Sequence, residues 1–349
     1  MKLIYFFYQM KKKRVTLKDI ASELGISIST VSRALKDHPD IDKGLTKKIK
    51  ALAQRWNYIP NPLAMGLLRQ QTRVIGVIVP DLVTYFFSSI ISGIEDELQQ
   101  AGYYIVISSS KESLEKEIEC VHNLLNLRID GLIVCLAQNS HQTDHFKKVL
   151  DHDVPLVFFD RVCLEKEVST VVVDNVSMAK DITTHFYENG ARRIAHITGP
   201  KHLNIVQERA EGYLKGLQEV GLPFEKKYLA HTDLSHQSTE KAIKKLLQLP
   251  QRPDAILGVN DTVIFATMKA IKAAGLKIPH DILLAGFSDE FHATVVEPNL
   301  TSVAHPTHEI GRNAAKLILE QIKEEKAIQK KIVLNTALYI RASSSRSKK

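Results

Sequence analysis

Short apolar runs that alternate with amphipathic stretches fill the chain from residue 74 onward and restrict its possible folds more than any other feature. Helix-like patterns between the runs include residues 87–101, 114–127, 178–189, 208–220 and 262–274. This alternation predicts an α/β architecture of doubly wound parallel sheets with helices on both faces. Eight runs are typical of buried strands: VIGVIV (74–79), YIVIS (104–108), GLIVC (131–135), PLVFF (155–159), VVVD (171–174), IAHIT (194–198), AILGV (255–259) and ILLAG (282–286).

The number of expected strands is about twice what one doubly wound lobe needs. We therefore expect two lobes with a cleft between them. Ligands of such folds bind at the carboxyl ends of the strands, so the cleft is the expected ligand site.

The segment VTLKDIASELGISISTVSRAL (residues 15–35) has a different pattern, which predicts two short helices joined by a tight turn. Thr16 is a suitable N-cap, and Asp19 three residues later completes a pair like a capping box. Gly25 suits the left-handed C-cap position, and Ser27 caps the second helix. A helix, a glycine turn and a second helix form the helix-turn-helix unit that reads DNA.

The charge distribution supports this interpretation. Residues 1–73 hold 15 Lys and Arg against 5 Asp and Glu, whereas the other 276 residues hold 32 against 34. Basic residues displace counterions from phosphates, so a basic head on a near-neutral body is typical of a nucleic-acid-binding protein.

The start of the second helix is expected to enter the major groove of double-stranded DNA. Ile28, Ser29, Thr30 and Arg33 are candidates for contacts with base edges, and Arg33 suits a bidentate contact to guanine. The residues better placed for phosphates are Thr16, Ser27 and Ser32.

A third head helix is expected over residues 46–57, and a short apolar helix follows it. In the sequence YIPNPLAMGLLRQ, Asn61 is a good N-cap and Pro62 occupies the first helical position. A helix this short is marginal alone, so it needs a partner. A second copy of the chain over DNA is the obvious one.

These motifs resemble the LacI/GalR family of transcription regulators. VTLKDIA, LGIS, STVSRAL and the NY.PN..A..L pattern match its head and hinge, and recognisable similarity covers roughly residues 14–342. The resemblance implies that paired hinge helices enter the minor groove, with Asn61 and Ala64 in the helix and Leu67 as the wedge between base pairs. It also implies three crossings between the lobes, so the N-terminal lobe includes a stretch after Leu300.

The resemblance also implies an effector pocket in the cleft. Arg209 matches an arginine that commonly binds a ligand oxygen, and Leu203 replaces an arginine of purine-binding members, which argues against a purine. We therefore expect a sugar or a sugar derivative. The full set of matched pocket positions is Asp81, Tyr85, Phe86, Asp160, Arg161, Arg209, Asn260, Asp261, Ser288 and Asp289.

Two other functional classes compete with a regulator. An α/β enzyme is disfavoured because the chain has no GxGxxG after a strand, no GxxxxGK[ST], no GxSxG and no metal-ligand cluster. A soluble sugar-binding protein without a regulatory role would have no use for the basic head.

The three cysteines show no metal or disulfide spacing, which suits a reducing cytoplasm. We expect no cofactor, no metal and no membrane span.

The sequence thus predicts a homodimeric, cytoplasmic, non-enzymatic regulator that acts as a repressor at a near-palindromic operator. Two start sites stay open: translation begins either at Met1, which gives the chain a leader, or at Met10. The expected segments are a disordered leader (1–13), a helix-turn-helix domain (14–59), a hinge helix and linker (60–72), a two-lobed dimerising sensor (73–342) and a disordered tail (343–349).

Overall fold

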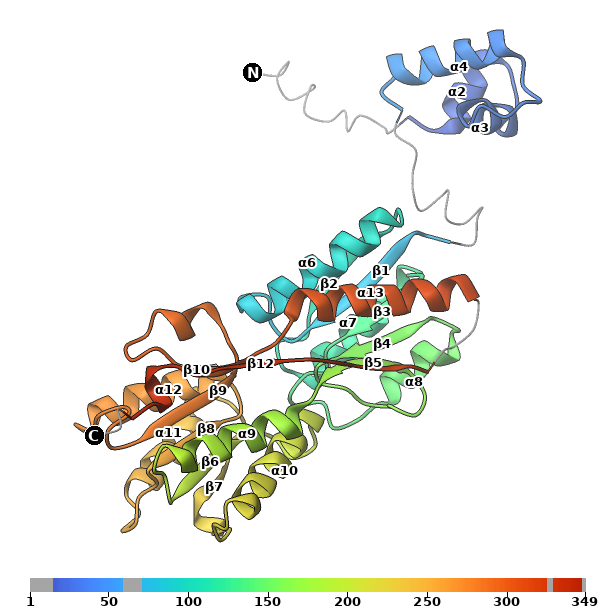
Figure 1. Cartoon of the computed structure of the whole chain (residues 1–349). Coiled ribbons are helices and arrows are strands. Elements are labelled where there is room, and N and C mark those ends of the chain that lie inside the picture. The colour runs from blue at the N-terminus through green and yellow to red at the C-terminus, as the bar shows by residue number, and fades with distance from the viewer. Residues whose placement is uncertain (1–14, 59–70, 325–328, 347–349) are drawn as a thin grey trace, which may run out of the picture. The chain divides into compact units, whose positions relative to one another are not determined.

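A computed structural model describes residues 15–58, 71–324 and 329–346 (Figure 1). The chain divides into two compact units, residues 1–72 and 73–349, which we describe separately. The expected leader and most of the expected hinge, including Asn61, Ala64 and Leu67, lie outside the described residues.

The first unit contains three helices, α2 (Leu17–Leu24), α3 (Ile28–Leu35) and α4 (Lys43–Arg55). The predicted capping box of Thr16 and Asp19 is present, and Gly25 ends α2 with a φ of 62°. Ser27 caps α3 as predicted. The third helix begins earlier than expected, because the Asp42 side chain caps it by accepting the Leu45 N–H at 2.8 Å. The buried core consists of Ile20, Ala21, Val31, Ala34, Ile49, Leu52 and Ala53.

The second unit contains two six-stranded sheets, one for each lobe. All pairs of the N-terminal sheet are parallel. Its strands, in spatial order, are β11 (Lys331–Leu334), β5 (Ser169–Val173), β4 (Leu156–Phe159), β3 (Gly131–Val134), β1 (Val74–Val79) and β2 (Tyr104–Ser109).

The C-terminal sheet is parallel except for one edge strand, β12, which runs antiparallel to β10. The predicted pair of doubly wound lobes is therefore confirmed, with one antiparallel edge. The strands, in spatial order, are β12 (Ala337–Tyr339), β10 (Thr301–Ala304), β9 (Leu283–Ser288), β8 (Ala255–Gly258), β6 (Ile194–Thr198) and β7 (Leu229–His231).

Helices cover both faces of each sheet (Figure 1). In the N-terminal lobe, α6 (Tyr85–Gln100) and α13 (Thr307–Glu324) share one buried core, and α7 (Leu114–Asn126) and α8 (Asp144–Asp151) pack on the opposite face. The C-terminal lobe places two helices on each face: α9 (Asn175–Glu188) and α10 (Asn204–Glu219) on one, and α11 (His236–Leu247) and α12 (Asp261–Ala273) on the other. Short 3₁₀ turns lie at η1 (Lys226–Tyr228), η2 (Phe291–Thr294) and η3 (Ala342–Ser344).

The chain passes between the lobes three times, as the family resemblance implied. It leaves the first sheet after β5, returns from β10 to α13, and crosses again from β11 to β12. Strands β7, β10, β11 and β12 were not predicted. They have only three or four residues each, and a run that short carries little periodicity.

Glycines allow two helix pairs to approach closely. A Cβ atom at Gly93 of α6 would overlap the carbonyl oxygen of His308 in α13, and one at Gly311 of α13 would overlap that of Ile90 in α6. Gly212 of α10 lies in the same way against the carbonyl oxygen of Val176 in α9. Each pair is therefore fixed by backbone contact, which a side chain would prevent.

The prediction of a disordered tail from residue 343 is wrong for residues 343–346. Ser343 and Ser344 are fully buried in the C-terminal lobe. The Ser343 hydroxyl donates to the Leu284 carbonyl at 2.7 Å, and the Ser344 hydroxyl lies 2.8 Å from Nε2 of His185. The polar composition of the tail suggested disorder, but the folded lobe supplies hydrogen bonds to it that composition alone does not reveal.

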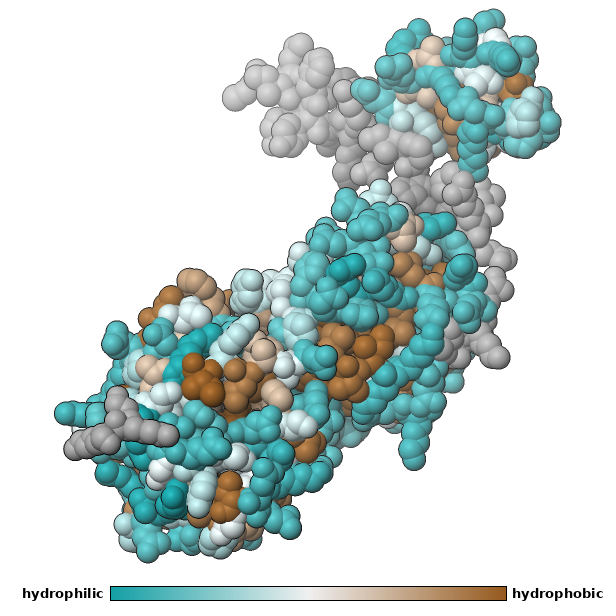
Figure 2. Space-filling view, viewed as in Figure 1, coloured by the Kyte–Doolittle hydropathy of each residue, from teal (hydrophilic) through white to brown (hydrophobic). Residues whose placement is uncertain are grey.

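The displayed surface is mainly hydrophilic, with apolar patches among the polar residues (Figure 2). Among the helices of the described residues, none is long and apolar enough to cross a membrane.

Candidate DNA interface and effector cleft

The N-terminal end of α3 presents a polar edge to solvent. Val31 and Ala34 bury one face of the helix in the head core. The opposite face leaves Ser29 and Arg33 exposed and Ile28 48% exposed. The structure thus places these three predicted base-reading residues on one accessible face, as a helix that enters a groove requires.

Hydroxyl groups organise the beginning of that helix. The Ser27 hydroxyl accepts the Thr30 N–H at 3.1 Å and lies 2.7 Å from Oγ of Ser29 and 2.8 Å from Oγ1 of Thr30. Ser32 is half-buried. Thr16 is exposed, but its hydroxyl already donates to Asp19 at 2.7 Å, so a phosphate would have to share it.

A cavity of about 600 Å³ lies where strands of both lobes end, in the size range of small-molecule sites. Both lobes supply its lining. The N-terminal lobe contributes Pro80, Asp81, Leu82, Val83, Thr84, Phe86, Phe87, Ser109, Lys111, Glu112, Gln138, Asp160 and Arg161, and the C-terminal lobe Ile205, Arg209, Leu234, Asn260, Thr262, Ser288 and Glu290.

Arg161, at the end of β4, is paired within its own lobe. Its Nη1 atom donates to both carboxylate oxygens of Glu112 at 2.9 and 2.8 Å, while its Nε atom is buried without a partner among the described residues. Glu112 also accepts the Gln138 N–H at 2.6 Å. The pair therefore links the ends of β2, β3 and β4 into one polar wall.

Arg209, on α10, is held in place on several sides. Its Nε donates to Oδ1 of Asn175 at 2.8 Å, its Nη1 donates to the Val259 carbonyl, and its guanidinium carbon lies 4.1 Å from the centre of the Phe287 ring. Burial lowers its pKa to about 10, partly offset by the charge of Asp160. It remains a cation at neutral pH, with a fixed orientation at the cleft.

Asp160 is 7% exposed and lines the cleft. Among the described residues, its carboxylate has one hydrogen-bond contact, a thiol of Cys135 at 4.0 Å. Burial raises its pKa, and the charges of Arg209 and Arg161 oppose that shift. A buried carboxylate without an N–H or O–H donor can accept hydrogen bonds from a ligand.

Several strand ends at the cleft have strained backbones. Lys111, Glu112, Asp160 and Ser288 have φ angles of 49°, 57°, 57° and 108°, although none is glycine. Such conformations cost free energy and concentrate at functional sites. All four residues line the cleft.

The structure brings seven of the ten predicted pocket residues into this lining: Asp81, Phe86, Asp160, Arg161, Arg209, Asn260 and Ser288. Contact of these residues with an effector stays a prediction. The other three, Tyr85, Asp261 and Asp289, lie outside the lining. Tyr85 is 63% exposed at the start of α6.

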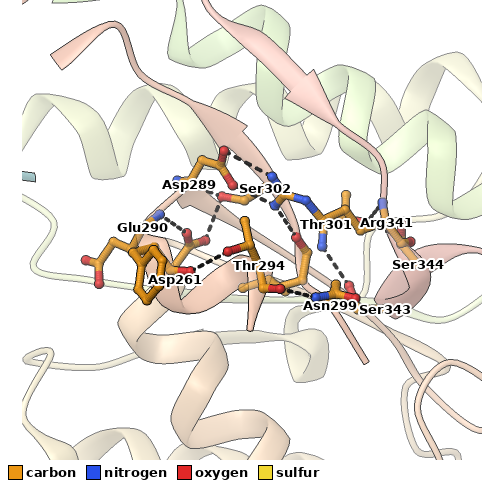
Figure 3. A network of polar contacts seen from close by, with 12 residues as sticks. Asp261, Asp289, Glu290, Thr294, Asn299, Thr301, Ser302, Arg341, Ser343 and Ser344 are labelled. Atoms are coloured by element: carbon orange, nitrogen blue, oxygen red, sulfur yellow. Dashed lines mark hydrogen bonds and ion pairs between the residues drawn. The ribbon is translucent and has the colours of Figure 1, made fainter. Parts of the chain in front are cut away.

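Asp261 and Asp289 belong to a polar network behind the cleft (Figure 3). Asp261 is fully buried; it accepts the Ser302 hydroxyl at 2.7 Å and the Glu290 N–H at 3.1 Å. Asp289 binds Arg341 through two contacts of 2.6 and 3.1 Å. The structure therefore places both carboxylates against internal partners and outside the lining, and their contact with a ligand stays a prediction.

Sequence reasoning missed several polar lining residues. Lys111 and Glu112 follow β2, Gln138 follows β3, and Glu290 follows β9. Their position after the ends of parallel strands was the available signal, because the cleft was expected at those ends. The set carried over from the family did not include them.

Comparisons with known proteins agree with this arrangement. Residues 16–61 match the model of bacterial regulatory proteins of the lacI family, and residues 72–342 match the model of periplasmic binding proteins and the sugar-binding domain of the LacI family. The HTH-type transcriptional repressor CytR of Escherichia coli K12 is 31% identical over 96% of this chain and 99% of its own length. The ribose operon repressor of the same organism is 28% identical over 94% and 99%.

Solved structures show the same similarity. The lac repressor dimer bound to operator and the anti-inducer ONPF matches with a TM-score of 0.81 at 26% identity, covering 96% of this chain and all of that one. A complex of the transcriptional regulator CelR with cellobiose matches with a TM-score of 0.72 at 27% identity, covering 95% and 100%. With both family models matched in order along one chain, the protein belongs to the LacI family of bacterial transcription regulators, with a helix-turn-helix DNA-binding domain and a two-lobed periplasmic-binding-protein-like domain.

Proposed function

We propose that the protein is a transcriptional repressor that binds a near-palindromic double-stranded operator as a homodimer. A small effector in the cleft, a sugar or a sugar derivative, sets its affinity for DNA. Two relatives support these assignments by their descriptions, one a lac repressor dimer on its operator and one a regulator in complex with cellobiose.

The observation that carries the proposal is the cleft formed by strand ends of both lobes in a chain that also has a DNA-reading helix. A ligand that contacts both lobes favours one arrangement of them over another. If that arrangement alters the fit to DNA, ligand and DNA affinities are coupled and change each other by the same factor.

The lining of the cleft suits a carbohydrate. It combines carboxylate, amide and guanidinium groups, from Asp160, Asn260 and Arg209, with the ring of Phe86. Polar groups of this kind bind hydroxyls, while an aromatic ring packs on the apolar face of a sugar. Leu203, the position that differs from purine-binding members, is fully buried and adds no charge to the site.

We propose that residues 60–72 transmit the signal. In this hypothesis a hinge helix capped by Asn61 forms on specific DNA, with Ala64 at the approach of its twin and Leu67 between base pairs. The effector changes the separation of the two hinges and so stabilises or melts them. Such a protein acts in the cytoplasm and needs neither catalysis nor a cofactor.

A thermal-shift screen of the full chain against monosaccharides, disaccharides, sugar acids, sugar phosphates and purines tests the sensor half. A ligand that binds the folded state raises Tm. Operator DNA selected from a random duplex pool then allows affinity to be measured with and without that ligand. A changed operator affinity supports the proposal. A ligand that binds without changing it contradicts the regulatory role and favours a plain sugar-binding protein.

A further inference from the structure

We infer that the effector cleft selects a polyol that carries a protonated amine, such as an amino sugar, and disfavours phosphorylated and acidic sugars. This inference rests on the proposed function, since it takes the cleft as the effector site. It concerns the charge of the ligand, which neither the family models nor the relatives specify.

The two arginines of the lining already have partners. Arg161 is bound to the Glu112 carboxylate, and the two side chains in this pair are 9% and 26% exposed. Arg209 donates to Asn175 and to the Val259 carbonyl and lies near the charge of Asp160. Nε of Arg161 has no partner among the described residues, so an anion can gain one contact there. Each guanidinium charge is nevertheless already balanced by a nearby carboxylate, Glu112 for Arg161 and Asp160 for Arg209, which repels a phosphate or carboxylate on a ligand.

The carboxylates of the lining, in contrast, have unused acceptor capacity. Asp160 is nine-tenths buried, and its carboxylate contacts a thiol but no N–H or O–H donor among the described residues. Asp81 accepts the Val83 N–H at 3.0 Å through one oxygen only. The Glu290 carboxylate has no hydrogen-bond donor in the described part of the chain, although its backbone N–H binds Asp261.

Asp81 and Glu290 extend into the cleft from opposite lobes. Asp81 follows β1 of the N-terminal lobe, and Glu290 follows β9 of the C-terminal lobe. Both residues line the same cavity. Burial raises the pKa of Glu290, the charge of His292 lowers it, and the charge of Asp81 raises it. If a ligand draws the two lobes together, an arrangement we call closure, these like charges approach and repel each other, and a cation between them relieves the repulsion.

Lys111 is the other charged group of the lining and is exposed. Its ammonium lies on a flexible stem and can turn to solvent, so it offsets the acidic groups only in part. A ligand ammonium has three N–H donors and can bind carboxylates from both lobes at once. An amine therefore both fills the unused acceptors and favours closure.

The test uses matched sets of sugars on three hexose scaffolds, gluco, galacto and manno. Each set contains the neutral hexose, the 2-amino-2-deoxy hexose, the hexose 6-phosphate and the uronate, measured by calorimetry with the full chain at constant ionic strength. On the scaffold that binds, we expect the amine to bind about tenfold tighter than the neutral sugar, and the two anions to bind more weakly than it.

Three variants and a control identify the groups responsible. Glu290→Gln and Asp81→Asn should each remove most of the tenfold preference for the amine, and Lys111→Met should increase it. Glu188→Gln, an exposed carboxylate at the end of α9 and outside the lining, should leave it unchanged. Because all three affected side chains are at least partly exposed, the variants are expected to fold.

A phosphate or uronate that binds tighter than the neutral sugar overturns this inference, and so does an amine with no advantage. Both outcomes leave the proposed sugar-responsive regulator intact. Failure of every sugar in every set, when the thermal-shift screen also finds no carbohydrate, removes the carbohydrate effector itself and the inference with it.

Discussion

Arg341 clamps Asp289 at the back of the cleft through two contacts, Nη1–Oδ1 at 2.6 Å and Nη2–Oδ2 at 3.1 Å. The two side chains are 19% and 13% exposed. Arg341 follows β12, beyond the last crossing between the lobes, and Asp289 lies between Ser288 and Glu290 of the lining. The C-terminal segment thus holds the strained turn that presents two cleft residues.

Arg341→Gln is therefore expected to lower the free energy of unfolding by roughly 2–4 kcal/mol, because it leaves a largely buried carboxylate without its cation. Chemical denaturation followed by circular dichroism measures the change. Arg252→Gln is the matched control. Its guanidinium lies 3.9 Å from Asp281 in a pair that is 43% and 37% exposed, so a change below about 1 kcal/mol is expected. Equal losses of unfolding free energy in both variants would show that the Arg341–Asp289 pair stabilises the fold no more than an exposed ion pair does.

Asp261 should make the stability of the sensor unit depend on pH. Burial raises its pKa from 3.8 to about 8, although hydrogen bonds from Ser302 and Glu290 oppose the shift. A carboxyl with a raised pKa stabilises the fold fully below its unfolded pKa and loses that contribution as the pH rises through its folded pKa. Between pH 5 and 9, Tm of the wild type should therefore fall relative to Tm of Asp261→Asn. Parallel Tm curves for the two proteins would contradict the raised pKa.

The approach of α6 and α13 predicts an unusual sign for a glycine substitution. In a helix, Gly→Ala ordinarily stabilises by about 1 kcal/mol. Gly311→Ala should instead destabilise the sensor unit, by roughly 1–3 kcal/mol, since the new Cβ overlaps the Ile90 carbonyl oxygen. Thermal unfolding measures the effect. Stabilisation by alanine would mean that the two helices separate at little cost.

Arg33→Ala should weaken specific operator binding by about 1–3 kcal/mol, because a base-edge contact is lost from the exposed face of α3. Fluorescence anisotropy with operator and with scrambled duplex separates the two kinds of binding. Arg55→Ala removes an exposed charge from α4 and serves as the control, with a similar small loss on both duplexes. If Arg33→Ala instead loses the same affinity for the operator and for the scrambled duplex, Arg33 contacts phosphate and not a base.

Much of this architecture was predictable because its signals are local. The Thr16–Asp19 capping box, the left-handed Gly25 and the apolar β1 run each depend on a few adjacent residues. The strand that begins at Lys331 was missed, since KIVL gains its order from pairing with β5, which is distant in sequence. The prediction of a disordered tail was wrong for a related reason. Ser343 is ordered by hydrogen bonds to the Leu284 carbonyl and from the Thr301 N–H, which are both distant in sequence.

The cleft was predictable by position more than by chemistry. Parallel strands place their carboxyl ends together, which predicted the position of the cleft, and the family resemblance supplied Asp160 and Asn260, which both line it. Asp261 follows Asn260 directly, yet it points into the buried network, because Ser302 and the Glu290 N–H bind its carboxylate. No feature of the sequence distinguishes a carboxylate with internal partners from one that faces a ligand.

The central claim is that the cleft controls DNA binding, and its most direct test is the operator affinity of wild type, Arg209→Ala and Asp160→Asn, each with and without the ligand found by thermal shift. The account predicts that the ligand changes the operator Kd of the wild type about tenfold or more, and that operator DNA changes the ligand Kd by the same factor. In the two variants the ligand should have no effect, while the operator Kd in its absence stays near that of the wild type. A ligand effect of wild-type size in both variants, or none in the wild type despite saturation of the cleft, would contradict the account.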